Sequence, residues 1–151
     1  MAVAEKDVTM GRDTISRSAA GAASTPKAGL WAGRILSALA VLFLLMDAVM
    51  KVMRAAPAVE GTVQLGYPES TVAGIGIVLL ACTALYVIPR AAVLGAILLT
   101  DYLGGAVATH VRLLNPLFSH TLFPVYVGVA IWLGLVLRNA NLRRALFAAR
   151  D

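Results

Sequence analysis

Four long apolar segments fill most of this sequence, and they constrain its fold more than any other feature. The second segment contains no charged residue over its whole length. In lipid, every backbone polar group must be bonded within its own element, and these segments lack the alternating pattern of barrel strands. We therefore expect an all-α polytopic membrane protein that forms a four-helix transmembrane bundle. The expected spans are Leu30 to Met53, Thr71 to Ile88, Ala91 to Val111 and Leu117 to Leu137.

The composition argues against a soluble protein. Hydrophobic residues make up 60% of the chain and charged residues 14%, against about 45–50% and about 25% in soluble domains. The 13 Lys and Arg lie mostly beside apolar segments rather than on one basic face. We therefore expect the lipid bilayer, and no nucleic acid, as a partner. The single cysteine, Cys82, can form neither an intrachain disulfide nor a redox pair.

The sequence divides into a membrane domain and two tails. Residues 1–28 are rich in Ala, Gly, Ser and Thr without a sustained apolar stripe, which predicts a disordered cytoplasmic tail. The membrane domain is expected over 29–147, followed by a short C-terminal tail at 148–151. Between the first two spans, an apolar loop predicts a short interfacial helix from Pro57 to Leu65.

The distribution of cations predicts the orientation. Ten of the Lys and Arg residues precede or open the first span, lie between the second and third spans, or follow the fourth. Lys51, Arg54 and Arg112 lie on the other side. The positive-inside rule then places both termini in the cytoplasm, and the pattern fits a bacterial plasma membrane.

Ionisable residues inside the spans are costly, so each is a candidate site residue. Asp47 and Lys51 stand four residues apart on one face of the first helix, and Arg54 is expected on that same face. Two interpretations remain open. The residues form a structural ion pair, or they form the polar floor of a ligand pocket that opens outward.

The third span carries one carboxylate and two pairs of small residues. Asp101 lies about midway along it, and its partner is expected from another helix. Gly104 with Ala108, and Gly105 with Thr109, form small-xxx-small pairs that predict the close approach of a neighbouring helix. The alternative is that these glycines leave room for a flat ligand ring.

His110 and His120 are the only histidines, and a short turn between the third and fourth spans is expected to bring them together near the outward end. Two histidines from adjacent helices can bind haem or a metal, or one can donate a hydrogen bond to a quinone carbonyl. Interfacial packing is a third interpretation. Two ligands alone make a poor metal site, so we expect no metal and favour a quinone over haem.

Four stretches of the sequence are similar to those of a known family. They are LGYPES (65–70), ACTALYVIPRAAVLGAILLTDYLGGAVATHVR (81–112), PLFSHTLFPVYVG (116–128) and LRNANLR (137–143). Together they resemble the DoxX-like family of small four-span bacterial membrane proteins over roughly residues 31–147. One position departs from the family pattern, in which the residue before YLGG is usually small and often Gly. Here that residue is Asp101.

The resemblance implies a four-helix membrane bundle and an association with quinone-reducing and other oxidoreductase assemblies. We therefore expect an accessory subunit of a redox or quinone-linked membrane assembly, with an oxidoreductase partner subunit. No catalytic motif suggests a stand-alone enzyme. The alternative is a small transporter or lipid-handling protein that acts as a homo-oligomer. The candidate ligand-binding residues are Asp47, Lys51, Asp101, His110, Arg112 and His120.

Overall fold

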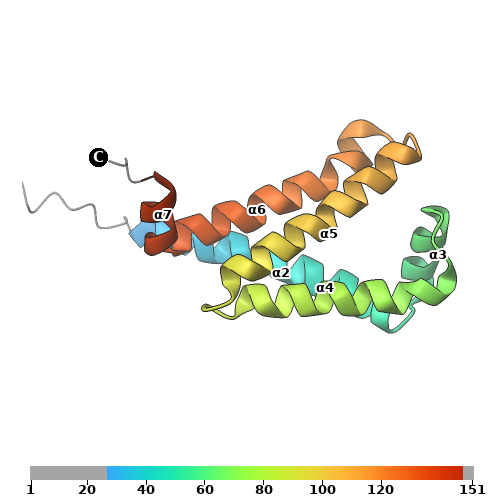
Figure 1. Cartoon of the computed structure of the whole chain (residues 1–151), viewed down its shortest axis with the longest axis horizontal. Coiled ribbons are helices and arrows are strands. Elements are labelled where there is room, and N and C mark those ends of the chain that lie inside the picture. The colour runs from blue at the N-terminus through green and yellow to red at the C-terminus, as the bar shows by residue number, and fades with distance from the viewer. Residues whose placement is uncertain (1–26, 148–151) are drawn as a thin grey trace, which may run out of the picture.

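In the computed structural model, which describes residues 27–147, four long helices alternate in direction and no strand occurs within that range (Figure 1). A 3-10 turn, η1 (Glu69–Thr71), leads into the second long helix, and a π-helical turn, η2 (Leu117–Thr121), precedes the fourth. With these turns, each long helix has the length and apolar composition to cross a bilayer. The chain is therefore an all-α, multi-pass membrane protein. The long helices are α2 (Lys27–Val52), α4 (Val72–Val87), α5 (Ala92–Arg112) and α6 (Phe123–Arg138).

Two short helices mark the two ends of the bundle. Helix α3 (Ala56–Gln64) lies between α2 and α4, where the sequence predicts a short helix one residue further along. Helix α7 (Ala140–Phe147) follows α6 at the opposite end, the end of the bundle at which α2 begins (Figure 1). We call the end with α3 the outer end and the end with α7 the inner end. Apart from Lys27 and Ala28, which already belong to α2, the predicted tails lie outside the described residues.

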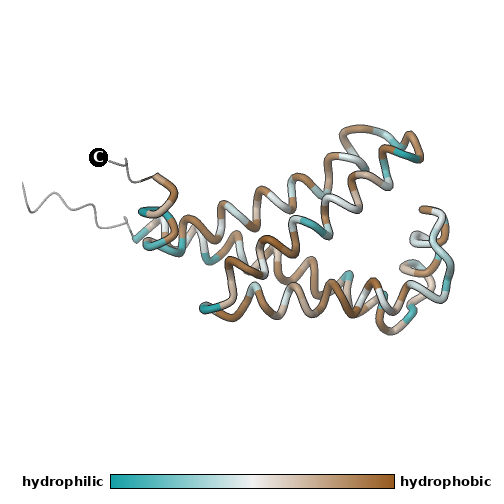
Figure 2. Tube along the Cα trace, viewed as in Figure 1, coloured by the Kyte–Doolittle hydropathy of each residue, from teal (hydrophilic) through white to brown (hydrophobic). Residues whose placement is uncertain are grey.

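Apolar residues predominate along the length of the bundle, and most of the strongly hydrophilic positions lie toward its two ends (Figure 2). This distribution suits helices that face hydrocarbon in the middle and water or head groups at both ends. Inside, the four long helices share one apolar core. Its largest members include Leu44, Leu79, Leu99, Ile131 and Leu135.

The long helices form a ring in which each packs against two neighbours. Helix α2 packs against α4 and α6, and α5 packs against the same two helices, so α2 and α5 lie diagonally opposite. Figure 1 shows α5 and α6 diverging from α2 and α4 toward the outer end. The bundle is therefore tight at its inner end and open at its outer end.

Two glycines near the inner end explain where the helices stay close. A Cβ atom on Gly95 of α5 would lie 2.2 Å from the backbone nitrogen of Tyr86 in α4. A Cβ atom on Gly134 of α6 would lie 2.5 Å from the Ser37 hydroxyl in α2. A side chain at either position would clash, so these glycines allow α5 to approach α4 and α6 to approach α2 closely, as small residues commonly do between membrane helices.

The close packing predicted around Gly104 and Gly105 is wrong for the described residues. A Cβ atom on either glycine would meet nothing within 4 Å. Both lie in the outer half of α5, where the helix has already diverged from α4, so no neighbouring backbone comes near.

Candidate ligand-binding pocket at the outer end

A cavity of about 480 Å³ lies at the outer end of the bundle, between the diagonal helices α2 and α5. We call it the outer pocket. Helices α3 and α6 contribute to its sides, and Phe43, Phe123 and Val127 give it apolar walls. Such a combination of apolar walls with a few convergent polar groups is typical of small-molecule sites. Its polar lining residues are Asp47, Lys51, Thr62, Tyr67, Asp101, Tyr102, Thr109 and His110.

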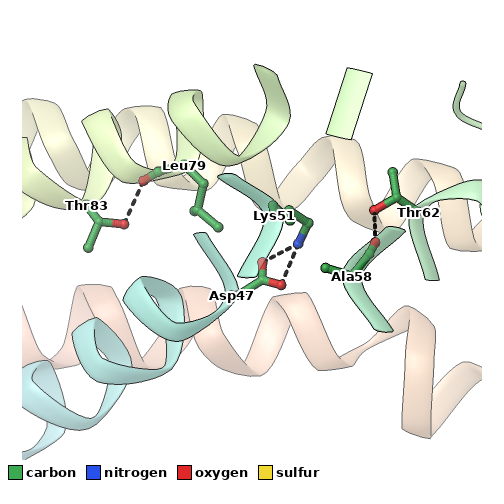
Figure 3. A network of polar contacts seen from close by, with 6 residues as sticks. All are labelled: Asp47, Lys51, Ala58, Thr62, Leu79 and Thr83. Carbon is green, nitrogen blue, oxygen red and sulfur yellow. Dashed lines mark hydrogen bonds and ion pairs between the residues drawn. The ribbon is translucent and has the colours of Figure 1, made fainter. Parts of the chain in front are cut away.

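Asp47 and Lys51 form an ion pair in the wall of the pocket. The Lys51 ammonium turns back along α2 and donates to both carboxylate oxygens of Asp47 (Figure 3). The side chains are only 16% and 33% exposed for Lys51 and Asp47. Because the two charges neutralise each other at short range, the pair can lie within the membrane-spanning region at a reduced cost.

Arg54 does not join this pair, so the expectation that it shares the Asp47 face is wrong. Helix α2 ends at Val52, and Arg54 adopts a positive φ of 53° that turns the chain away from the helix. Its guanidinium instead lies 2.6 Å from the Glu69 carboxylate in η1. This exposed ion pair connects the two ends of the α3 segment.

The hydroxyl groups of the pocket have defined hydrogen-bonding roles. Thr109 donates to the carbonyl oxygen of Gly105, at 2.9 Å, and its oxygen lies 2.9 Å from the Tyr67 hydroxyl. Since Thr109 has only one proton, Tyr67 must donate in the second contact. Thr62 donates to the Ala58 carbonyl within α3, on the side of the Asp47–Lys51 pair (Figure 3).

His110 has a defined tautomer. The amide nitrogen of Asn115 lies 2.9 Å from Nδ1 of His110, and an amide nitrogen can only donate. Nδ1 of the neutral ring therefore accepts, and the ring proton sits on Nε2. His110 is also one of the residues that line the outer pocket.

His120 lies beside His110, as the short turn predicts, but it does not line the pocket. The ring centroids are 6.0 Å apart, and Nδ1 of His120 is 2.8 Å from the Ser119 hydroxyl. Within residues 27–147, no group of three or more His, Cys, Asp or Glu is arranged to hold a metal ion.

Arg112 also lies outside the pocket lining. It forms a hydrogen bond with the connection between α3 and α4. Its guanidinium donates to the Leu65 carbonyl at 3.1 Å, next to Gly66, whose φ of 85° requires glycine. Together with the Tyr67–Thr109 contact, this bond ties the α3–α4 connection to α5. We call these two contacts the α3 clasp.

Asp101 lies at the edge of the outer pocket and is exposed in the bundle. It makes no hydrogen bond or ion pair with any other residue that the structure describes. The partner expected from another helix is therefore not provided by residues 27–147. Of the six candidate residues, the structure brings Asp47, Lys51, Asp101 and His110 to one pocket and leaves Arg112 and His120 outside its lining.

Sequence reasoning missed the neutral polar residues of the pocket. Tyr67 and Tyr102 are easily taken for an aromatic belt, and Thr62 and Thr109 for surface or packing positions. One sequence feature could have identified them: all four lie in the outer half of the bundle, at a depth similar to that of Asp47 and His110. Their convergence depends on tertiary contacts across up to 42 residues of sequence, which no local pattern contains.

A second cavity, about 520 Å³ in volume, runs along α5 and α6 on the lipid-facing side. Its lining contains no ionisable residue. The polar atoms of two lining residues, Trp132 and Thr100, are already hydrogen bonded to each other at 2.9 Å. This groove offers no unmatched polar group to select a ligand, so the outer pocket is the candidate site.

Comparison with known proteins assigns the chain to a family. No curated protein and no solved structure matches it. The DoxX-like family matches residues 35–134, which include α4 and α5, most of α2 and α6, and every lining residue of the outer pocket. That match covers well over half of the chain and contains the pocket residues Asp47, Lys51, Asp101 and His110. The protein therefore belongs to the DoxX-like family.

Proposed function

We propose that this protein is the accessory membrane subunit of a redox assembly and that its outer pocket holds a quinone-like molecule. The outer pocket carries the proposal, because it combines hydrogen-bonding groups with apolar walls inside a membrane bundle. The Nε2 proton of His110 and the hydroxyl of Tyr102 are donors suited to the carbonyl oxygens of a quinone ring. Gly105 leaves space for the ring, since a Cβ atom there would meet nothing within 4 Å.

Several features favour binding over catalysis by the chain alone. The Asp47 carboxylate is already bonded to Lys51, and the Thr109 proton to a backbone carbonyl. Neither is therefore free to act as a base or a nucleophile while these contacts last. The groups of the pocket are better suited to hold and orient a molecule that a partner subunit reduces or oxidises.

The proposed location is a bacterial plasma membrane with the inner end facing the cytoplasm. Arg34, Arg90 and Arg138 lie at the inner end. At the outer end, Lys51 and Arg54 are each paired with a carboxylate. With Lys27, Arg143 and Arg144, the described residues place six Lys and Arg at the inner end, against Lys51, Arg54 and Arg112 at the outer end, and this excess supports cytoplasmic termini.

The binding proposal is tested with the full chain in lipid nanodiscs, titrated with decyl-ubiquinone and followed by calorimetry. We expect saturable binding to the wild-type protein. His110→Phe removes the Nε2 donor and should raise the Kd roughly tenfold, as expected for the loss of one hydrogen bond in a buried site. His120→Phe is the matched control, since His120 lies outside the lining, and it should leave the Kd unchanged.

Failure to bind decyl-ubiquinone, or equal Kd values for the two histidine variants, would contradict the proposal. Native mass spectrometry of the protein extracted from its own membrane gives a second test. A bound quinone and a co-purified chain that carries a flavin, haem or iron–sulfur cluster support the accessory role. Phospholipid alone would instead favour a lipid-handling protein.

A further inference from the structure

The lipid-facing groove along α5 and α6 follows most of the length of α6. Its lining extends from Pro124, near the outer end of that helix, to Val136, near its inner end. At 1.5 Å per residue, the distance along the helix between these two positions is about 18 Å. One leaflet contributes about half of a hydrocarbon layer of about 30 Å. The groove is therefore long enough for a single acyl chain.

The walls of the groove are apolar. Val125, Val129 and Leu133 follow one another at intervals of four residues along α6, and all three are exposed. Because the polar atoms of Trp132 and Thr100 are bonded to each other, the walls offer a ligand only apolar contacts. Such walls suit an acyl chain, and any selection between ligands has to come from the residues at the ends of the groove.

Helix α7 forms the inner end of the groove. Phe147, at which α7 ends, belongs to the groove lining although it is 73% exposed. Two contacts fix α7 to the bundle. Leu142 packs against the apolar core, and the side-chain oxygen of Asn139 caps the first turn by accepting a hydrogen bond from the Leu142 backbone nitrogen at 3.1 Å. The position of α7 at the end of the groove is therefore a defined part of the fold (Figure 1).

Arg144 lies on the same face of α7 as Phe147. The two residues are three apart, and residues with this spacing are neighbours on a helix surface. The arginine thus stands one turn before the phenylalanine, beside the inner end of the groove. It is exposed, and its guanidinium makes no hydrogen bond or ion pair with any residue that the structure describes. The site therefore combines an apolar groove with a cation at its inner end.

The charge of the whole inner end favours an anionic ligand there. Within residues 27–147, the inner end carries its six Lys and Arg and no Asp or Glu. Basic sites of this kind beside membrane helices attract anionic lipid head groups. The carboxylates of the same range all lie in the middle or at the outer end of the bundle: Asp47, Glu60, Glu69 and Asp101.

We propose that the groove binds one anionic phospholipid, with an acyl chain along α5 and α6 and the phosphate on Arg144. The phosphate oxygens supply the acceptors that the Arg144 guanidinium lacks, in charge-assisted hydrogen bonds. A further apolar helix could cover the groove, but it would leave this guanidinium unmatched, whereas a phospholipid satisfies both the groove and the cation. The inference concerns a different site from the outer pocket and does not depend on the molecule held there.

Trp132 lines the groove, so its fluorescence reports which lipid occupies the site. The sequence contains two tryptophans, and Trp31→Phe leaves Trp132 as the only one. The full chain is reconstituted in phosphatidylcholine vesicles with a rising fraction of a lipid whose acyl chains are brominated, since bromine quenches a tryptophan that it contacts. We expect brominated phosphatidylglycerol to reach half-maximal quenching at a roughly fivefold lower fraction than brominated phosphatidylcholine.

Two pairs of variants separate this site from a general attraction between the protein and anionic lipid. Arg144→Gln removes the head-group contact and should abolish most of the preference for phosphatidylglycerol. Its matched control is Arg90→Gln, which removes another exposed cation of the inner end but lies outside the groove and should keep the preference. Val129→Phe narrows the groove beside Trp132 and should also abolish it. The control there is Ile77→Phe on α4, because both residues are 58% exposed.

Three results would overturn the proposal. Equal quenching by the two brominated lipids would show that the groove does not select an anionic head group. An equal loss of preference in Arg144→Gln and Arg90→Gln would show that only the total charge of the inner end matters. If neither brominated lipid quenches Trp132, protein rather than lipid covers the groove.

Discussion

Tyr86 connects three helices through one fully buried side chain. Its hydroxyl donates to the Ile131 carbonyl in α6 at 2.8 Å and lies 3.0 Å from the Ser37 hydroxyl in α2. The Arg138 guanidinium lies over its ring, 4.8 Å from the centroid, and donates to its carbonyl oxygen. Nothing in the local sequence shows that this tyrosine is buried. It is the polar centre of the inner end.

We expect Tyr86→Phe to lower the free energy of unfolding by about 1–3 kcal/mol, because it removes two buried hydrogen bonds and leaves their partners unsatisfied. The measurement is a denaturation curve of the purified protein in mixed micelles. Tyr126→Phe is the control, since Tyr126 is 50% exposed and makes no hydrogen bond with the described residues. Equal curves for the two variants would show that the Tyr86 contacts contribute nothing to stability.

At the scale of single elements, α3 is held to the bundle by few contacts. Only one of its residues, Thr62, is buried, and the α3 clasp and the Arg54–Glu69 ion pair hold its flanking segments. Segments with little buried surface open more readily than the core of a protein. The wall that α3 gives to the outer pocket is therefore its least stable part.

Arg112→Met removes one half of the α3 clasp, and we expect amide hydrogen exchange over residues 56–67 to accelerate roughly tenfold, as expected for one lost hydrogen bond. Exchange in α4 and α6 should stay the same. The readout is mass spectrometry of the protein in nanodiscs after deuterium labelling. Arg34→Met removes a cation at the inner end and is the control. If both variants exchange alike, the Leu65 carbonyl contact does not restrain α3.

How much of this structure the sequence predicts depends on the range of the interaction. The spans follow from hydropathy, and the Asp47–Lys51 pair follows from a spacing of four on one helix. The role of a glycine does not follow, because Gly95 and Gly104 look alike in sequence and differ only in which backbone lies opposite. The Tyr67–Thr109 contact likewise depends on how far α5 diverges from α4, which is a tertiary property.

At the scale of the whole molecule, the unequal charges of the two ends predict a single orientation. In a Cys82→Ala background, Gly61→Cys in α3 should react with a membrane-impermeant maleimide added to intact cells. Arg90→Cys, at the inner end between α4 and α5, should react only after the membrane is permeabilised. Both positions are exposed. Labelling of Arg90→Cys in intact cells would reverse the proposed orientation.

The spans differ in length, and this difference matches the molecule to a membrane of limited thickness. At 1.5 Å per residue, the 26 residues of α2 extend about 39 Å, and the 19 residues of η1 and α4 extend about 28 Å. Because Tyr86, near the end of α4, bonds to Ser37, the surplus of α2 lies beyond the inner end of α4. There the guanidinium of Arg34 stacks 5.7 Å from the centre of the exposed Trp31 ring, a combination suited to the head-group layer.

A hydrocarbon layer of about 30 Å already slightly exceeds the reach of the shorter span. A thicker bilayer would have to thin locally around α4, and hydrophobic mismatch of this kind sorts proteins between membrane regions. The short second span should therefore direct this protein to the thinner parts of its membrane, whatever molecule its pocket holds.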